Sequence, residues 1–238
     1  MSDAVLLPVY NEEATVDAVL DAVRRYFQGD ILVVDDGSTD ATVGALAERR
    51  DVTVITHPFN MGYGRALAEG FSVARARGCE RVVTMDCDGQ HEPAHIPQFL
   101  AVLDEGWDIV SGSRYLPASK ELGIVVPGDR QRVNQRVTEE INRVTGWRLT
   151  DAFCGFKAYR LNALEGIELN EPGYGMPVEM WAKVYRAGLL VRELAVERIY
   201  CDHNRSFGDA LDDPEHRFGY YMRVWGRALG AGGEGRRP

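Results

Sequence analysis

The sequence predicts an α/β protein with a mostly parallel central sheet and helices on both of its faces. Short, unbroken apolar segments alternate with amphipathic segments through the first half of the chain, which is the order of a doubly wound sheet. The apolar segments lack polar alternation, as strands covered on both faces do. Acidic residues follow several of these segments directly, and ligands bind beyond the carboxyl ends of such strands.

The strands of the first half are predicted from their apolar runs, and the helices from apolar residues at three- and four-residue spacing, as at Val16, Val19 and Leu20. Thr39 or Asp40 is the expected N-cap of the second helix, because both side chains accept hydrogen bonds from helix-terminal N–H groups. The predicted order is strand 4–9, helix 13–27, strand 31–34, helix to about 50, strand 52–56, helix to about 78, strand 81–85, helix 94–105 and strand 108–113.

The second half of the chain is less periodic. Residues 115–128 contain Pro, Gly and a short apolar run without a clear period. They predict a long loop, and such loops often serve as lids or binding elements. The remaining segments predict a polar helix at 129–145, a turn and short strand at 151–156, a helix at 177–187 and an edge strand within 190–200.

Neither a linker nor an internal repeat divides the chain, and its length suits one large domain. We therefore expect a single domain over residues 1–229. The tail 230–238 is rich in Gly and Arg and is expected to be disordered.

Composition and charge limit the function. The 238 residues are 45% hydrophobic and 26% charged, which is enough apolar surface for a sizeable core. The net charge of −9 argues against nonspecific binding to nucleic acid. The cysteines show no CxxC pairing, as expected for reduced thiols in the cytosol. No apolar run reaches the ~20 residues of a membrane span and no basic n-region precedes the first strand, so we expect a cytoplasmic protein with at most peripheral membrane contact.

Two carboxylates, Asp86 and Asp88, follow the predicted strand 81–85. Residues two apart in a strand point to the same side, and two carboxylates aimed at one point repel each other unless a proton or cation joins them. Hard divalent cations prefer oxygen ligands and are often shared with phosphate oxygens. Gln90 adds an uncharged oxygen. The stretch predicts a metal–diphosphate site, and the alternative is an ordinary polar turn, since Asp and Gly are common in turns.

Polar residues also follow two other predicted strands. Tyr10 and Glu12 come after strand 4–9, and Asp35 and Asp36 close strand 31–34. The fold brings these strand ends and Asp86 to one edge of the sheet. The chain lacks both Gly-x-Gly-x-x-Gly after the first strand and the Gly-Lys-Ser/Thr of a P-loop, so dinucleotide-binding and P-loop functions have no support.

Taken together, the motifs resemble those of the family 2 glycosyltransferases of GT-A fold, and most closely the dolichyl-phosphate (polyprenyl-phosphate) mannose synthase branch. The resemblance implies an inverting, metal-dependent enzyme that transfers a hexose from a GDP-mannose or UDP-glucose type donor to a polyprenyl phosphate. It also implies a nucleotide-sugar half, about 1–114, and an acceptor half, about 115–229. The matching motifs are Pro8-Val9-Tyr10-Asn11-Glu12, Val34-Asp35-Asp36-Gly37-Ser38-Thr39-Asp40, Asn60-x-Gly62-x-Gly64, Asp86-x-Asp88-Gly89-Gln90-His91, Gly112-Ser113-Arg114-Tyr115, Asp151-x-x-x-Gly155-Phe156 and Arg205-Ser206-x-Gly208.

The same resemblance implies roles for individual residues, in four groups. The donor nucleotide would be contacted by Tyr10, Glu12, Asp36 and Asp86, with Pro8 shaping the base pocket. The metal, Mg²⁺ or Mn²⁺, would be held by Asp86, Asp88 and Gln90. Arg205 and Ser206 would lie on a mobile loop that closes over the donor phosphates. The acceptor would face Arg114, Arg130, Arg132 and Asn134, although the loop before Arg130 matches the family less cleanly.

The acceptor decides whether a general base is needed. A hydroxyl must lose a proton to a nearby carboxylate, whereas a lipid phosphate is already ionised, with a second pKa of about 6. Asp151 and Glu179 are the candidate bases. Asp151 could instead position the acceptor or cap the turn before Gly155, and Glu179 could simply be an acid in the first turn of a helix.

Three other functions remain open at this level. The same donor chemistry could serve a soluble or cell-envelope hydroxyl. A nucleotidyltransferase would be expected to carry a Gly-rich triphosphate loop with a Lys near the first strand, which this chain lacks. A nonenzymatic nucleotide-sugar binding module would not need the arginines of the acceptor half.

The segment 213–229 predicts an amphipathic helix with Pro214 in its first turn. Phe218, Met222, Trp225 and Leu229 form one apolar stripe. This helix could lie in a membrane interface, or pack on the domain or on a partner in a homodimer.

Overall fold

The computed structural model describes residues 2–123, 128–200 and 209–230. Arg205 and Ser206, with the rest of the expected closing loop, lie outside the described residues. So does the tail from residue 231 onward, for which disorder was expected.

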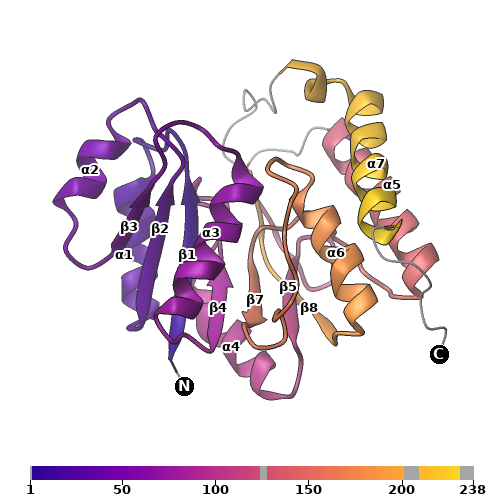
Figure 1. Ribbon diagram of the computed structural model, residues 1–238, viewed down its shortest axis with the longest axis horizontal. Coiled ribbons are helices and arrows are strands. Elements are labelled where there is room, and N and C mark those ends of the chain that lie inside the picture. Colours follow the sequence, from indigo (N-terminus) through magenta and orange to yellow (C-terminus); the bar gives the residue numbers. More distant parts are fainter. Residues whose placement is uncertain (1, 124–127, 201–208, 231–238) are drawn as a thin grey trace.

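Within the described residues a seven-stranded sheet forms the centre of the molecule (Figure 1). Strand β7 runs antiparallel to both of its neighbours, and the other pairs are parallel. The mostly parallel sheet is therefore confirmed, with β8 as the expected edge strand. In spatial order the strands are β3 (Thr53–Thr56), β2 (Asp30–Asp35), β1 (Asp3–Val9), β4 (Arg81–Thr84), β7 (Lys157–Arg160), β5 (Ile109–Ser113) and β8 (Val191–Ala195).

Helices cover both faces of this sheet, as the unbroken apolar strands predict. Along β1, Val5 and Leu7 point into one core cluster and Ala4 and Leu6 into the other, because successive side chains of a strand alternate between faces. The first cluster is closed by α1 (Val16–Tyr26), α2 (Thr42–Glu48) and α4 (Ile96–Asp104), and the second by α3 (Tyr63–Ala76) and α6 (Met176–Ala187).

A third apolar cluster joins α6 to α5 (Gly128–Thr145) and α7 (Pro214–Gly230). Helices α5 and α7 lie side by side at one end of the molecule (Figure 1). Tyr221 and Trp225 of α7 are buried against Val137 and Trp181. The apolar side of α7 is thus used in packing on its own domain. In the described part of the chain, no helix combines the length and apolarity needed to cross a membrane.

Several element boundaries differ from the predictions. The expected loop 115–128 contains β6 (Glu121–Gly123), which pairs in parallel with β9 (Arg198–Tyr200) in a separate small sheet. The strand expected within 151–156 begins at Lys157 instead. Helix α2 begins after Ala41, which provides no side-chain cap, and Asp40 instead accepts the N–H of Thr42. Two 3-10 helices, η1 (Pro93–His95) and η2 (Asp209–Asp212), precede α4 and α7.

Candidate active site

A pocket of about 730 Å³ opens at the carboxyl ends of β1, β2 and β4 and extends toward α5 and α7. The strand ends therefore meet at one edge, as the fold class predicts. One half of the wall comes from Pro8, Val9, Tyr10, Glu12, Asp36, Asn60, Gly62, Tyr63, Ala66, Asp86, Cys87, Asp88 and Gln90. The other half comes from Arg114, Tyr115, Arg130, Val133, Asn134, Phe153, Gly173, Tyr174, Pro177, Arg217 and Tyr221.

The predicted metal ligands Asp86, Asp88 and Gln90 all line this pocket. They follow β4 directly, and the turn is made possible by Gly89, whose φ of 73° suits a residue without a side chain. Asp88 Oδ1 accepts the backbone N–H of Gln90 at 3.0 Å, which tightens the turn. Carboxylate and amide oxygens in a partly open site are the ligands that Mg²⁺ and Mn²⁺ prefer.

The carboxylate of Asp86 lies against a glycine. A Cβ atom added at Gly155 would lie 2.4 Å from Asp86 Oδ2, so only glycine leaves room for this carboxylate. The hydroxyl of Tyr63 donates to Asp86 Oδ1 at 3.2 Å. The Oδ2 atom of Asp86 also lies 3.9 Å from Nε2 of the buried His91. Among the described residues, no guanidinium or ammonium group forms a salt bridge with Asp86.

The side chain of His91 stabilises the same turn from the interior of the protein. It is buried, stacks on Phe156 and accepts the backbone N–H of Asp86 at its Nδ1 atom. Burial lowers the pKa of His91, but a hydrogen bond to Cys154 and the negative charge of Asp86 outweigh this effect and raise it. His91 is therefore a buried part of this turn, and the imidazole of His95 pairs separately with the carboxylate of Glu197.

The predicted nucleoside residues Pro8, Tyr10, Glu12 and Asp36 also line the pocket. Asp36 is 3% exposed and is fixed by hydrogen bonds from the backbone N–H groups of Met61 and Gly62 and from the buried imidazole of His57.

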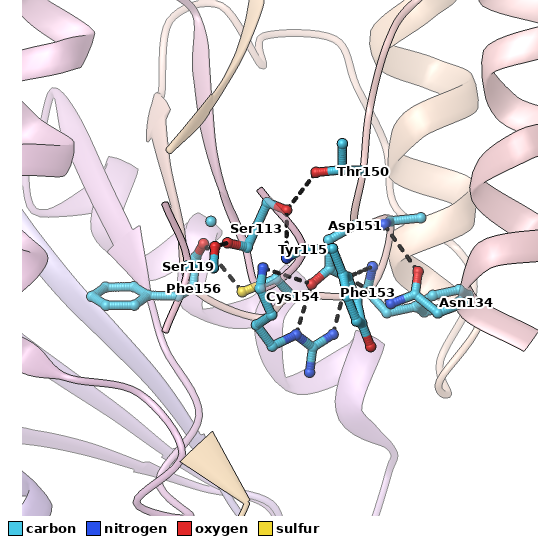
Figure 2. Close-up of polar contacts among 12 residues, drawn as sticks. Ser113, Tyr115, Ser119, Asn134, Thr150, Asp151, Phe153, Cys154 and Phe156 are labelled. Atoms are coloured by element: carbon cyan, nitrogen blue, oxygen red, sulfur yellow. Dashed lines mark hydrogen bonds and ion pairs between the residues drawn. The ribbon is translucent and has the colours of Figure 1, made fainter. Parts of the chain in front are cut away.

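In the other half of the pocket, the buried Asp151 lies beside Asn134 and Phe153 (Figure 2). Its carboxylate holds Arg114 in place. Arg114 donates from Nε to Asp151 Oδ2 at 2.7 Å and from Nη2 to Oδ1 at 3.0 Å. Asn134 donates to the same carboxylate at 2.8 Å. Glu193 of β8 in turn accepts the backbone N–H groups of Thr150 and Asp151, which anchors this turn to the sheet.

These contacts keep Asp151 ionised and use both of its carboxylate oxygens. Burial alone raises the pKa of Asp151, but the charge and hydrogen bonds of Arg114, together with Asn134, hold it far below its usual range. The side chain also accepts the backbone N–H of Phe153, which caps the turn before Gly155. Asp151 is not among the residues that line the pocket. These surroundings favour positioning and turn capping, two of the roles expected for Asp151, over proton abstraction.

Glu179, the other candidate base, is buried outside the pocket. Its carboxylate accepts the backbone N–H groups of Asn170 and Glu171 and pairs with Lys183 at 2.7 Å. It therefore ties the loop before α6 to that helix, beyond the expected role of an acid in a first helical turn.

The predicted acceptor residues are not all brought together. Arg114, Arg130 and Asn134 line the pocket, whereas Arg132 is exposed on α5 and does not. Arg205 and Ser206 lie outside the described residues. Sequence reasoning missed Arg217, a pocket residue only 2% exposed that pairs with Asp129 at 2.9 Å. It also missed the aromatic wall of Tyr63, Tyr115, Phe153, Tyr174 and Tyr221.

One signal could have found part of this wall. Tyr63 lies between the glycines of Asn60-x-Gly62-x-Gly64 and begins α3, after the loop that follows β3. No comparable signal exists for Arg217 or Tyr221, which reach the pocket through the packing of α7.

The family model described as "Glycosyl transferase family 2" matches residues 4–167. Among curated relatives, an undecaprenyl-phosphate mannosyltransferase of Micrococcus luteus is 32% identical over 200 residues, which cover 80% of this chain and 81% of the relative. A polyprenol monophosphomannose synthase of Mycolicibacterium smegmatis is 31% identical over 201 residues, or 81% of this chain and 75% of the relative.

Solved structures agree on the fold. A glucosyl-3-phosphoglycerate synthase of Mycobacterium tuberculosis, in complex with Mn²⁺, UDP and glucosyl-3-phosphoglycerate, superimposes with a TM-score of 0.72 at 23% identity. The superposition covers 96% of this chain and 80% of that structure. The expected architecture, a mostly parallel sheet with helices on both faces, is thus shared with that synthase.

Proposed function

The chain belongs to glycosyl transferase family 2 and is a glycosyltransferase, and on that basis we propose that it transfers a hexose from a nucleotide-sugar donor to a polyprenyl phosphate. The curated relatives named above act, by their names, on undecaprenyl phosphate and on a polyprenol phosphate. The acceptor is assigned to this chain from those names together with the charge distribution of its own pocket.

The observation that most supports the proposal is the separation of acidic and basic side chains in the pocket wall. Among the described wall residues, the carboxylates all follow strands of the donor half: Glu12, Asp36, Asp86 and Asp88. The guanidinium groups all come from later in the chain: Arg114 from the end of the donor half, and Arg130 and Arg217 from the acceptor half. An acceptor hydroxyl would need a carboxylate on its own side to take its proton. An ionised phosphate needs only cationic partners, which these residues supply.

In this proposal the donor half binds the nucleotide and its diphosphate. Pro8, Tyr10, Glu12 and Asp36 contact the nucleoside, and Asp86, Asp88 and Gln90 hold Mg²⁺ or Mn²⁺. A divalent cation, when bound there, neutralises the diphosphate as a leaving group. Tyr63 and Gly155 keep the Asp86 carboxylate in place for this purpose.

The acceptor half binds and orients the second substrate. Arg114, held by Asp151 and Asn134, pairs with the acceptor phosphate, and Arg130 and Arg217 add positive charge. A phosphate oxygen attacks the anomeric carbon, the bond from that carbon to the diphosphate oxygen breaks, and the nucleoside diphosphate leaves with the bonding electrons. Attack opposite to the leaving group inverts the anomeric configuration. Apolar wall residues such as Val133 and Phe153 suit the hydrocarbon that adjoins the phosphate.

A polyprenyl phosphate is anchored in a membrane, so the proposed reaction takes place at a membrane surface to which the chain binds peripherally. Because α7 buries its apolar side within the domain, we do not assign membrane binding to that side. A homodimer stays a prediction.

The test is a transfer assay with the full chain and MnCl₂. Polyprenyl monophosphate in detergent micelles is incubated with UDP-glucose or with GDP-mannose, and products are identified by mass spectrometry. We expect a hexose to be added to the lipid phosphate. The matched acceptor is the corresponding polyprenol, which lacks only the phosphate and should remain unmodified. Equal transfer to the polyprenol would show that a hydroxyl is the acceptor and would overturn the proposal.

A further inference from the structure

A tyrosine of α7 brings a hydroxyl group without a hydrogen-bond partner to the pocket. Tyr221 lines the pocket and is only 3% exposed. Its hydroxyl group forms no hydrogen bond within residues 2–123, 128–200 and 209–230. The hydroxyl oxygen is not one of the fully buried, unpaired side-chain atoms of that part of the chain. The small exposed area of Tyr221 therefore includes this oxygen, and it lies at the pocket.

The ring of Tyr221 is held by packing, and this fixes the direction of its hydroxyl group. The side chain belongs to the third apolar cluster. Its ring centroid lies 4.6 Å from that of Phe153 and 5.4 Å from that of Tyr220. The hydroxyl group of a buried tyrosine usually has a hydrogen-bond partner in the protein. A buried polar group that lacks one calls for an explanation, and a partner supplied by a ligand is such an explanation.

The surroundings of this hydroxyl group are positively charged. Arg217 lies one helical turn before Tyr221, and it is buried and lines the same pocket. Its guanidinium group is held by Asp129 at 2.9 Å and by the carbonyl oxygen of Leu211 at 2.8 Å. Burial raises the pKa of Tyr221 to about 12, against the positive charges of Arg217 and Arg130, which lower it. The hydroxyl group thus keeps its proton near neutral pH and can donate it to a hydrogen bond.

A hydroxyl donor near two guanidinium groups suits an anionic oxygen. Two anionic groups enter the pocket in the proposed reaction, the diphosphate of the donor and the phosphate of the acceptor. We have placed the diphosphate at the acidic wall, where a cation joins it to Asp86 and Asp88. The wall that contains Tyr221 has no carboxylate among its described residues, and it therefore suits the phosphate of the acceptor.

We infer that Tyr221 is a substrate-binding residue whose hydroxyl group donates a hydrogen bond to a non-reacting oxygen of the acceptor phosphate. The inference rests on the proposed function, in which this phosphate binds near Arg114, Arg130 and Arg217. A phosphate monoester has three terminal oxygens that accept hydrogen bonds. One of them attacks the anomeric carbon, and the others remain available to such donors. Because the contact exists before and during the transfer, it acts on acceptor binding and not on the chemical step.

The experiment compares the wild-type chain with Tyr221→Phe, which lacks only the hydroxyl oxygen. Acceptor kinetics are measured with polyprenyl monophosphate in detergent micelles and MnCl₂, and UDP is titrated calorimetrically with MnCl₂. The KM for the lipid phosphate should rise at least about tenfold with little change in kcat, because hydrogen bonds to charged groups are strong ones. The affinity for UDP should change by less than about twofold. The midpoint of thermal unfolding should not fall, because the hydroxyl group has no partner in the described protein to lose.

Tyr220→Phe is the matched control, because this neighbouring tyrosine uses its hydroxyl group on Glu171 and Gly175 within the protein. It should raise the KM for the nucleotide sugar and leave the acceptor KM nearly unchanged, the reverse of Tyr221→Phe.

Three results for Tyr221→Phe would overturn the inference while wild-type transfer to the lipid phosphate leaves the proposed function standing. The first is an unchanged acceptor KM, and the second is a loss confined to UDP binding. The third is a lower unfolding midpoint, which would show that the hydroxyl group serves the fold. Wild-type protein that transfers no hexose to the lipid phosphate would contradict the proposed function itself and the inference with it.

Discussion

The buried carboxylate of Asp151 sets the direction of a guanidinium that faces the pocket. Arg114, Asn134 and the N–H of Phe153 occupy both of its oxygens. A bidentate guanidinium–carboxylate pair fixes orientation as well as charge. Arg114 is thereby held ready to meet an anionic group without having to be ordered by it.

Asp151→Asn is expected to weaken both the fold and the acceptor site. Removing one charge of a buried pair destabilises a protein by about 3–5 kcal/mol, and the KM for the lipid phosphate should rise more than tenfold because Arg114 loses its partner. Urea unfolding and acceptor kinetics measure the two effects. Arg143→Gln, at an exposed ion pair on α5, is the control and should change neither quantity.

The same substitution predicts a pH dependence. The pKa of Asp151 is far below its usual range in the folded protein, so its ionisation stabilises the fold at any pH above the ordinary value of about 3.9. That stabilisation is lost as the pH falls below the ordinary value. The difference in unfolding free energy between wild type and Asp151→Asn should therefore be constant from pH 7 to 5 and shrink at lower pH. A difference that grows on acidification would contradict this account.

Gly155 offers a steric test of the metal site. A methyl group at this position would lie 2.4 Å from Asp86 Oδ2, and the carboxylate would have to move. Gly155→Ala should abolish the Mn²⁺-dependent part of the thermal stabilisation by UDP. Gly44→Ala is the matched control, because a Cβ there meets nothing within 4 Å in an exposed part of α2. Full metal-dependent stabilisation of Gly155→Ala would show that Asp86 does not hold the cation.

At the scale of elements, α7 braces the loop that forms one wall of the pocket. The hydroxyl of Tyr220 donates to Glu171 at 2.6 Å and accepts the N–H of Gly175 at 3.1 Å. Between those positions lies Tyr174, which stacks on Tyr63 with ring centroids 6.2 Å apart. Helix α7, at the far end of the chain, therefore helps to position Tyr174 against Tyr63 in the pocket wall.

Tyr220→Phe should loosen this loop without unfolding the domain. Loss of the two hydrogen bonds is expected to raise the KM for the nucleotide sugar by up to about thirtyfold with little change in kcat, because each hydrogen bond contributes about 1 kcal/mol. Tyr185→Phe serves as a control, since its ring packs on Trp147 on the far side of α6. An unchanged KM in Tyr220→Phe would mean that α7 has a packing role alone.

Sequence patterns predicted elements well where the element is buried and local. Each of these elements is indicated by its own sequence pattern, a continuous apolar run in β1, β2 and β4 and the helical spacing of apolar residues in α1 and α6. The strand pair β6 and β9 was missed because each strand has three residues and pairs with a segment far away in the chain. The strand predicted within 151–156 begins later, at Lys157. The residues before it form a turn that is held by hydrogen bonds to the Asp151 side chain, such as the one from the Phe153 N–H, and not by a recognisable turn sequence.

At the scale of the whole molecule, two unlike halves meet around one pocket. The acidic wall, which we propose binds the donor, could be predicted from the sequence, because its acids follow strands whose ends must meet at one edge. Much of the opposite wall, proposed for the acceptor, could not be predicted, because Arg217 and Tyr221 reach the pocket only through the packing of α7 on α5 and α6. Arg132 was expected there from the resemblance to the family, but its side chain is exposed on α5 and does not line the pocket.

The roles given to individual pocket residues depend on one central claim, that Asp86 and Asp88 join a divalent cation to the diphosphate of the donor. Calorimetric titration of UDP into wild type and Asp88→Ala, each with MnCl₂ and with EDTA, tests it most directly. We predict binding to wild type that is at least about tenfold tighter with the metal, and Asp88→Ala protein that is folded but shows no such difference. Equal, metal-enhanced binding by both proteins would contradict the claim.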